Sequence, residues 1–308
     1  MTEMRLFRLG PDGRDVELPG STVALEAELQ RRVEASMEAM LGVRFLASEY
    51  PTGPWHRGRV DSLGLDEDGA PVIVEFKKGA DSGVVSQALS YLSWLLSARY
   101  EFEALVRRRL GAEAADGIDW RNARLICVAA AFSHHDRVAV RRLPERVSLV
   151  RYRVFEGGLL SLQLVEASPG TPGFAADRRR SRDEREQDAV VRTTGQAGLE
   201  VAPACLRDLY GELDEALTAW GDVEVNVLRH YVAYRLLVNR ASVVFRPKQG
   251  ALLVYLALTP DAVALEEGFT RDMRGIGHLG TGDLEVRIAS ATDLEKAAPL
   301  IRRAFESV

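Results

Sequence analysis

Cysteine, net positive charge and long apolar runs are all scarce in this chain of 308 residues. Its two cysteines, Cys127 and Cys205, lie far apart in the sequence, which excludes a disulfide framework and a thiolate metal site. The formal net charge is -5, so a uniformly basic coat for nucleic acid or anionic membrane is excluded, and phosphate contacts need local basic patches. The longest apolar runs, Leu125 to Phe132 and Ala251 to Leu258, are too short to span a bilayer.

The composition is that of a soluble globular protein, with 46% hydrophobic and 28% charged residues. A chain of this length exceeds the size at which one core usually keeps growing, which predicts two domains. The segment 168–198 is rich in Pro, Gly, Arg and Asp, and we interpret it as a charged linker between domains at 1–167 and 199–308. Residues 1–10 lack the apolar core of a signal peptide, so we expect a cytoplasmic protein with no membrane partner.

The first domain alternates between helical and strand periodicity. A helix is expected from Val23 to Leu41, capped by Ser21-Thr22 and ended by Gly42. The further elements expected are a strand at Val43 to Tyr50, two strands at Gly58 to Leu65 and Pro71 to Lys77, a helix at Val84 to Ala98, a strand and helix within Glu101 to Leu110, a buried strand at Leu125 to Ala131, and a closing pair at Val147 to Val154 and Leu159 to Val165. Strands mixed with helices predict an α/β domain with a mixed sheet flanked by helices.

The second domain has fewer elements and a simpler pattern. Helices are expected at Leu206 to Trp220 and Thr292 to Phe305. A hairpin is expected around Pro247-Lys248-Gln249-Gly250, between Val243 to Phe245 and Leu252 to Leu258. This pattern predicts a smaller α+β domain.

Two charged residues interrupt an otherwise apolar strand in the first domain. Side chains alternate along a strand, so Glu75 and Lys77 share a face with Ile73, while Val72, Val74 and Phe76 form an apolar second face. A glutamate and a lysine in such surroundings are costly unless they have a partner or a task. The pair is therefore a candidate functional site.

Asp61 can join this pair only in one hairpin register. With the three-residue loop Glu67-Asp68-Gly69, Asp61 lies directly opposite Glu75, and glycine suits the left-handed position of such a loop. With the two-residue loop Asp68-Gly69, Asp61 instead opposes Phe76 and points to the other face. Asp61 can therefore share a site with Glu75 and Lys77 only if the loop has three residues.

Two carboxylates held together are the hard oxygen ligands that Mg²⁺ or Mn²⁺ prefers. A metal at Asp61 and Glu75 would activate a water and neutralise charge on a phosphate. Lys77, two residues from Glu75, would then position that water or stabilise the same charge. These residues predict phosphodiester hydrolysis.

The order of these residues resembles the PD-(D/E)XK nucleases. Gly58-Arg59-Val60-Asp61 followed by Val74-Glu75-Phe76-Lys77 is similar to the Asp...Glu-x-Lys core, although Val60 stands where the motif has proline. In the RecB-like and NucS-like branches, an acidic first helix and a Gln-x-x-x-Tyr helix accompany this core, here matched by Glu26-Ala27-Glu28-Leu29-Gln30 and by Gln87 with Tyr91. The resemblance implies a restriction-endonuclease-like fold, a catalytic role for Gln87, and a further metal-site acid at Glu26, with Glu28 as the alternative.

The resemblance covers roughly Leu25 to Val165. The C-terminal half resembles a domain of unknown function that often follows such nuclease domains, and no function transfers with it. We expect it to select substrate or to form a homodimer.

Other motifs favour structural interpretations. Gly275 to Gly280 fits G-x-G-x-x-G but lacks the strand-to-helix setting of a dinucleotide site, which favours a glycine-rich loop. His134 and His135 are adjacent and lack zinc spacing, which favours surface positions. Aromatic and basic residues interleave between Tyr231 and Lys248, a pattern that suits base stacking, but a sheet core with charged edges is favoured. Trp55, near the candidate site in sequence, is read as a core or rim residue.

The sequence thus predicts a Mg²⁺- or Mn²⁺-dependent endonuclease, with DNA favoured over RNA as substrate. Two rivals remain open. One is a binding module that kept the fold but lost hydrolysis, and the other is an interaction protein whose second domain recruits a partner in repair or defence. The acidic positions weigh against the pure binder, because carboxylates repel phosphate.

Overall fold

The computed structural model describes residues 4–9, 15–23, 25–53, 58–79, 83–168, 202–221, 223–228, 230–276 and 280–306. The chain divides into two compact units, Met1–Ala175 and Ala176–Val308, which are described separately. Apart from Ser168, the predicted linker 168–198 lies outside the described residues, as does Trp55. No helix in the described ranges is both long and apolar enough to cross a membrane.

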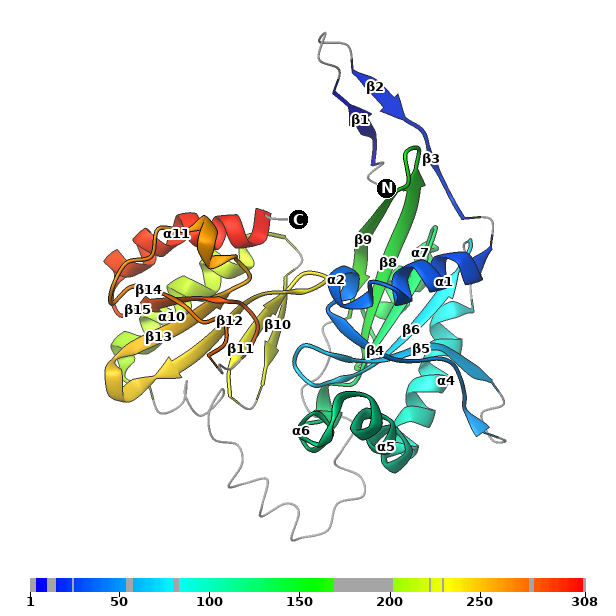
Figure 1. Cartoon of the computed structure of the whole chain (residues 1–308), viewed down its shortest axis with the longest axis horizontal. Helices are drawn as coiled ribbons and strands as arrows, with labels where there is room; N and C mark the ends of the chain where they lie inside the picture. The colour runs from blue at the N-terminus through cyan, green and yellow to red at the C-terminus, as the bar shows by residue number, and fades with distance from the viewer. Residues whose placement is uncertain are drawn as a thin grey trace. The chain divides into compact units, whose positions relative to one another are not determined.

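A seven-stranded mixed sheet forms the centre of the first unit's described residues (Figure 1). Its strands are β3 (Gly20–Ser21), β4 (Val43–Pro51), β5 (Arg59–Asp66), β6 (Pro71–Lys77), β7 (Arg124–Ala129), β8 (Arg146–Phe155) and β9 (Leu159–Ala167). They are ordered β3-β8-β7-β6-β5-β4, with β9 also pairing with β8. The β6–β7 and β7–β8 pairs are parallel, and the other pairs are antiparallel. Two further strands, β1 (Leu6–Arg8) and β2 (Val16–Leu18), form a small separate sheet.

Helices cover both faces of the large sheet. The helices are α1 (Glu26–Glu34), α2 (Met37–Leu41), α4 (Val84–Ser97), α5 (Arg99–Leu110), α6 (Ala112–Asp116) and α7 (His134–Val140), with a 3-10 turn η1 at Trp120–Asn122. Leu95 of α4 packs in one core with Leu63, whereas Glu34 of α1 accepts a hydrogen bond of 2.5 Å from the Ser62 hydroxyl. Because Ser62 and Leu63 are consecutive on β5, α1 and α4 lie on opposite faces. The predicted α/β class is confirmed.

Most of the strands predicted in this unit are confirmed to within a few residues, including the buried strand β7 and the hairpin β8–β9. The long first helix is wrong in detail, because Ala35 and Ser36 break it into α1 and α2. Ser21 does not cap it either, since it pairs with Val154 in the sheet. Gly42 does end the second helix, at φ 65°.

The strand predicted within Glu101 to Leu110 is wrong, because α5 spans this whole segment. Its buried residues Phe102, Leu105 and Val106 recur at helical rather than alternating spacing. Helix α7 was not predicted, although Ser133 and Asp136 form a capping box that marks its start. His134 and His135 lie exposed on this helix, as the surface interpretation expected.

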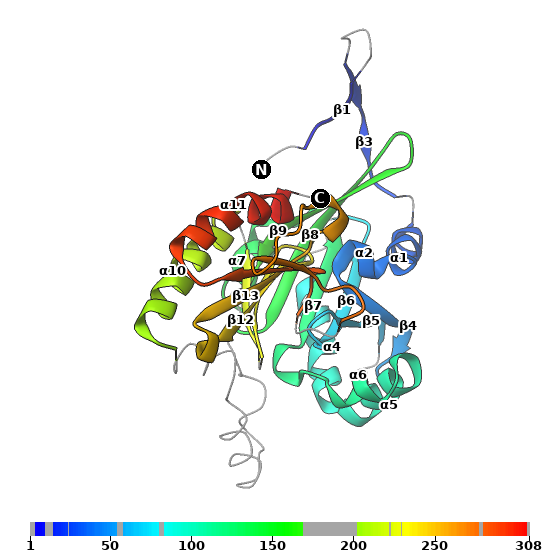
Figure 2. The same cartoon turned by 60° about the vertical axis from the view of Figure 1, so that its left-hand side comes forward.

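The second unit is an antiparallel six-stranded sheet in its described residues, ordered β10-β11-β12-β13-β15-β14. The strands are β10 (Glu224–Val227), β11 (Val232–Arg235), β12 (Asn239–Arg246), β13 (Ala251–Leu256), β14 (Thr270–Asp272) and β15 (Leu284–Ile288). Two short 3-10 turns, η2 (Pro247–Gln249) and η3 (Pro260–Ala262), follow β12 and β13. Helices α10 (Ala204–Thr218) and α11 (Ala291–Glu306) lie together on one side of this sheet (Figure 2).

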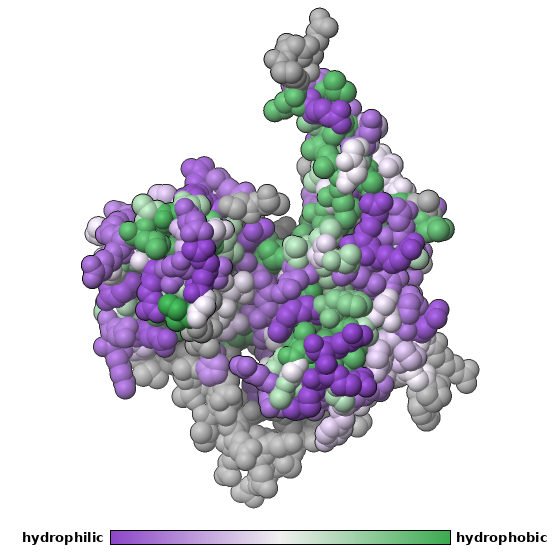
Figure 3. All heavy atoms as spheres, in the orientation of Figure 1, coloured by the Kyte–Doolittle hydropathy of each residue, from purple (hydrophilic) through white to green (hydrophobic). Residues whose placement is uncertain are grey.

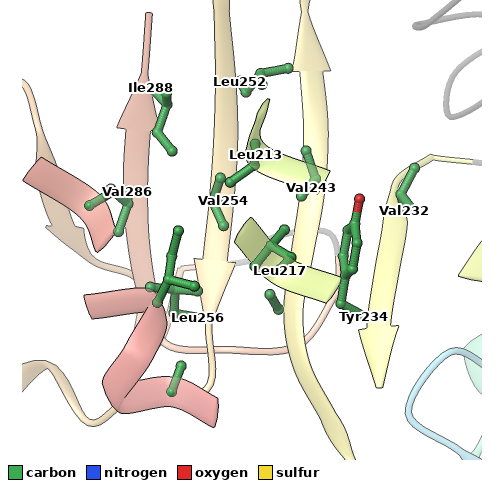
Figure 4. Packing of buried hydrophobic residues seen from close by; sticks show 14 of the residues in the cluster. Leu213, Leu217, Val232, Tyr234, Val243, Leu252, Val254, Leu256, Val286 and Ile288 are labelled. Atoms are coloured by element: carbon green, nitrogen blue, oxygen red, sulfur yellow. The ribbon is translucent and has the colours of Figure 1, made fainter. Parts of the chain in front are cut away.

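The core of this unit lies between the sheet and the two helices. Figure 4 shows Leu213 and Leu217 of α10 against Val243, Val254 and Val286 of the sheet. The two predicted helices and the hairpin β12–β13 are confirmed, as is the smaller α+β fold. Tyr234 and Arg235 are buried, which agrees with the sheet-core interpretation of the aromatic and basic residues here.

Candidate active site

The β5–β6 hairpin has the register on which the sequence prediction depends. Asp66 and Ala70 flank the three-residue loop, with the Asp66 N–H donating to the Ala70 carbonyl at 2.9 Å. Gly69 has φ +83°, the left-handed conformation that this loop requires. The ladder pairs Ser62 with Val74, and the next pair outward in the same register is Asp61 with Glu75. The three-residue loop, which was one of the two alternatives, is therefore confirmed.

Asp61 and Glu75 are in direct contact. The Asp61 N–H donates to Glu75 Oε1 at 3.3 Å, and the Phe76 N–H donates to Asp61 Oδ2 at 2.8 Å. Glu75 is fully buried. Each carboxylate thus retains at least one oxygen lone pair for a ligand, while backbone donors fix its orientation.

Burial and mutual repulsion destabilise the charged forms of both carboxylates. Burial, followed by the charge of Asp61, raises the pKa of Glu75 to about 8. Burial also raises the pKa of Asp61, against the opposing effects of the Phe76 N–H and the Lys77 charge. A buried and a half-buried acid whose ionisation is unfavourable are typical of a functional site, and a bound cation would reverse that penalty.

Lys77 lies at the end of β6 beside an acid from α1. Its Nζ is 3.7 Å from Glu26 Oε2, and its side chain is 17% exposed, against 47% for Glu26. Glu28, the alternative acid on this helix, instead forms an ion pair of 2.9 Å with Arg32 on the surface. Glu26 is thus the acid of α1 that the fold brings toward Lys77.

Gln87 approaches the same carboxylates from α4. Its amide Nε2 lies 3.4 Å from Glu75 Oε2 and 3.2 Å from the Tyr91 hydroxyl. Gln87 and Tyr91 are one helical turn apart, so both reach the same side of the helix. Tyr91 also packs closely on the chain at Gly58, where an added Cβ would lie 2.5 Å from the Tyr91 hydroxyl. Gly58 therefore keeps room for this helix at the site.

Two residues of α1 that the sequence did not single out hold Asp61 in place. Gln30 is buried and donates to the Asp61 carbonyl at 2.8 Å and to Ser48 Oγ at 3.1 Å. Glu34 accepts from Gln30 at 3.1 Å and from Ser62 at 2.5 Å. Gln30 thus acts on the Asp61 backbone, whereas Glu34 acts on the neighbouring Gln30 and Ser62. Their polar character on a buried helix face was the available signal.

Glu49 on β4 is a fourth acid near the site that sequence reasoning missed. The ladder pairs Ser48 with Ser62 and Tyr50 with Val60, so Glu49 stands opposite Asp61. Its charge contributes to the raised pKa of both Asp61 and Glu75. Glu49 also has φ 50°, a left-handed conformation that is uncommon for residues other than glycine. Such a residue is typical of functional sites.

The donor set suits a hard divalent cation. Asp61 and Glu75 supply carboxylate oxygens of the type that Mg²⁺ and Mn²⁺ prefer. Among the described residues, no group of three or more His, Cys, Asp or Glu side chains is arranged so that it could hold a metal ion. The fold brings together a pair of carboxylates, with Glu26 placed next to Lys77 instead. Water would have to complete the coordination, as is usual for Mg²⁺.

Comparison with known proteins gives one family match and one full-length relative. Residues 199–308 match the family described as a domain of unknown function, DUF5655. A protein of Haemophilus influenzae described as uncharacterized is 25% identical over 308 residues, which cover 98% of this chain and 100% of that protein.

Two solved structures share limited similarity with the chain. A repair endonuclease from Pyrococcus abyssi is 22% identical with a TM-score of 0.28, over 42% of this chain and 48% of that one. The structure of an EndoMS-dsDNA2 complex is 18% identical with a TM-score of 0.26, over 48% of this chain and 65% of that one. Each match spans less than two thirds of the solved chain. Similarity at this level leaves the geometry of the site as the basis for assigning a function.

Proposed function

We propose that the first unit is a metal-dependent nuclease of the PD-(D/E)XK type, which hydrolyses phosphodiester bonds in DNA. The observation that carries this proposal is the hairpin register, which sets Asp61 opposite Glu75, with the Asp61 N–H donating to the Glu75 carboxylate. Lys77 follows on the same face of β6, and Gln87 reaches Glu75 from α4. A carboxylate pair can hold a metal ion, and an adjacent lysine can stabilise charge on the phosphate, so the arrangement suits phosphodiester hydrolysis.

Asp61 and Glu75 would hold Mg²⁺ or Mn²⁺ through their free carboxylate oxygens, while Glu26 would act through its contact with Lys77. The ion, when bound, supplies charge neutralisation at the phosphate and a more acidic water. Lys77 orients the attacking water and stabilises negative charge on the phosphate oxygens. Gln87 positions the Glu75 carboxylate through its amide.

DNA is proposed as the substrate in preference to RNA, with internal cleavage rather than removal of end nucleotides. The limited similarity to a repair endonuclease and to an EndoMS structure with double-stranded DNA is consistent with this choice.

The proposal is tested by incubating the full chain with single-stranded, duplex and branched DNA, with Mn²⁺ or with a chelator. We expect the protein to cleave DNA with Mn²⁺ and not with the chelator. The Asp61→Asn and Glu75→Gln variants should not cleave it under either condition. Lys77→Ala should lower the rate about 10²- to 10³-fold, the usual cost of removing one electrostatic group.

Glu28→Gln is the matched control for Glu26→Gln, because both remove one carboxylate from α1 but only Glu26 lies next to Lys77. Only the Glu26 variant should slow cleavage. Undiminished cutting by a folded Lys77→Ala protein would contradict the role of Lys77. If the protein binds DNA without metal and never cuts it, the nuclease proposal is wrong and the protein is a binding module on the same fold.

A further inference from the structure

One face of the second unit's sheet is turned away from both helices, and the strand registers identify its residues. Phe245, Leu252 and Val286 belong to the core beneath α10 and α11. Their strand neighbours point the other way, because side chains alternate along a strand. Between β13 and β15, Leu253 pairs with Arg287 and Tyr255 pairs with Glu285. Arg271 of β14 also pairs with Glu285, from the other side of β15. Arg246 lies at the end of β12. We call these residues the outer face: Arg246, Leu253, Tyr255, Arg271, Glu285 and Arg287.

The outer face has an apolar centre, because Tyr255 lies in a small buried cluster with Val244 and Met273, and Leu253 packs against it. Basic side chains lie around this centre. Arg246 and Arg271 are exposed and Arg287 is half-buried. Lys248, which is also exposed, follows Arg246 in the turn η2. Glu285 is the one acidic residue among the outer-face positions, and it is hydrogen-bonded to the Tyr255 hydroxyl. The face therefore presents three guanidinium groups against one carboxylate. Figure 3 shows hydrophilic side chains over much of the visible surface of this unit.

Three other basic residues of the second unit form ion pairs on its surface. Arg274 bridges Asp261 and Asp272, Lys296 pairs with Glu266, and Arg302 pairs with Glu306. Within the described residues, Arg246, Arg271 and Arg287 take part in none of the ion pairs. In a protein with a net charge of -5, three such arginines on one face form a local anion-binding surface.

We propose that the outer face of the second unit binds the phosphate backbone of a nucleic acid. The arginines lie on β12, β15 and β14, which are separated by up to three strand spacings, or about 14 Å. This span exceeds one phosphate group, so the face suits a chain of phosphates. Guanidinium groups bind phosphate oxygens through paired hydrogen bonds, and such contacts position a nucleic acid without reading its sequence. The inference is independent of the proposed function, because it concerns binding by the second unit and needs no cleavage.

The test measures binding of a fluorescent DNA oligonucleotide to the full chain in a chelator, which prevents metal-dependent cutting. The variant carries Arg246→Ala, Arg271→Ala and Arg287→Ala together. We expect its affinity at low salt to fall at least about tenfold. The slope of log affinity against log salt should become shallower by about 2 to 3, because each phosphate contact contributes roughly 0.7 to 0.9 to that slope. Thermal melting checks that the variant is folded.

A matched control carries Arg207→Ala, Lys296→Ala and Arg302→Ala, which remove the same charge from helices α10 and α11 on the other side of the sheet. Its affinity and salt slope should remain near those of the parent. The proposal is overturned if the parent does not bind DNA at low salt, if the outer-face variant binds as the parent does, or if the control loses as much affinity. A parent that binds DNA but never cuts it would refute the proposed nuclease and leave this surface supported.

Discussion

Glu75 is a buried acid, and the folded protein favours its protonated form. Its pKa is raised from 4.5 to about 8, chiefly by burial and then by the charge of Asp61. Between these pH values the folded protein holds a proton that the unfolded chain has released, so the free energy of unfolding falls as pH rises through this window. In a chelator, we expect the metal-free protein to lose on the order of a few kcal/mol between pH 5 and pH 8. Urea unfolding at both pH values measures this loss.

Glu75→Gln should remove most of that pH dependence, because the amide does not titrate. Glu28→Gln, on the exposed side of α1, should keep the parent's pH dependence. Mn²⁺ added at pH 8 should stabilise the parent and not the Glu75→Gln protein, since a ligand stabilises the state that binds it. Equal pH dependence in the parent and in Glu75→Gln would show that another group controls it.

The individual site residues could be predicted to different degrees. Glu75 and Lys77 stand out because strand alternation puts them on one face, a property of the local sequence alone. Glu49 could not be found in this way. Its position depends on the pairing of β4 with β5 across the connection from Thr52 to Gly58, and no short turn rule fixes that register.

At the scale of elements, the β5–β6 turn sets the geometry of the site. Gly69 has φ +83°, and an added Cβ would lie 3.0 Å from the Gly117 carbonyl oxygen. Gly69→Ala should therefore lower the free energy of unfolding by about 1–2 kcal/mol, the usual cost of a left-handed non-glycine residue. Gly79→Ala is the control, because nothing lies within 4 Å of its Cβ and it has no positive φ. Urea unfolding compares the two, and an equal loss in both would contradict the role of the turn.

Elements were predictable where their signal was short-range. The β5–β6 hairpin follows from one glycine and an odd loop length, and β7 from an uninterrupted apolar run. The break between α1 and α2 was not predictable, because Ala35 and Ser36 carry no strong helix-breaking signal. Val33 and Met37 are buried on either side of this break. The sequence of helix α5 wrongly predicts a strand in part of this segment, because Phe102 and Val106 also favour strands.

At the scale of the whole molecule, each unit has a hydrophobic core of its own. Leu95 is fully buried in the core of the first unit, and Leu213 in that of the second. The composition change near residue 168 predicts a linker there, because a segment poor in apolar residues cannot join two cores. Apart from Ser168, that segment lies outside the described residues. The arrangement of the second sheet's outer face was not predictable, since it depends on pairings among strands that are distant in sequence.

Separate cores should unfold separately. Leu95→Ala and Leu213→Ala each remove a fully buried side chain, at a cost of about 2–5 kcal/mol to the unit that contains it. In differential scanning calorimetry of the full chain, we expect two transitions, with each substitution lowering the midpoint of one and leaving the other in place. The two variants are matched in chemistry and burial, so each is the control for the other. A single transition that both substitutions shift equally would mean that the two cores fold as one cooperative unit, and the DNA-binding and cleavage assays would then have to be interpreted for the whole chain.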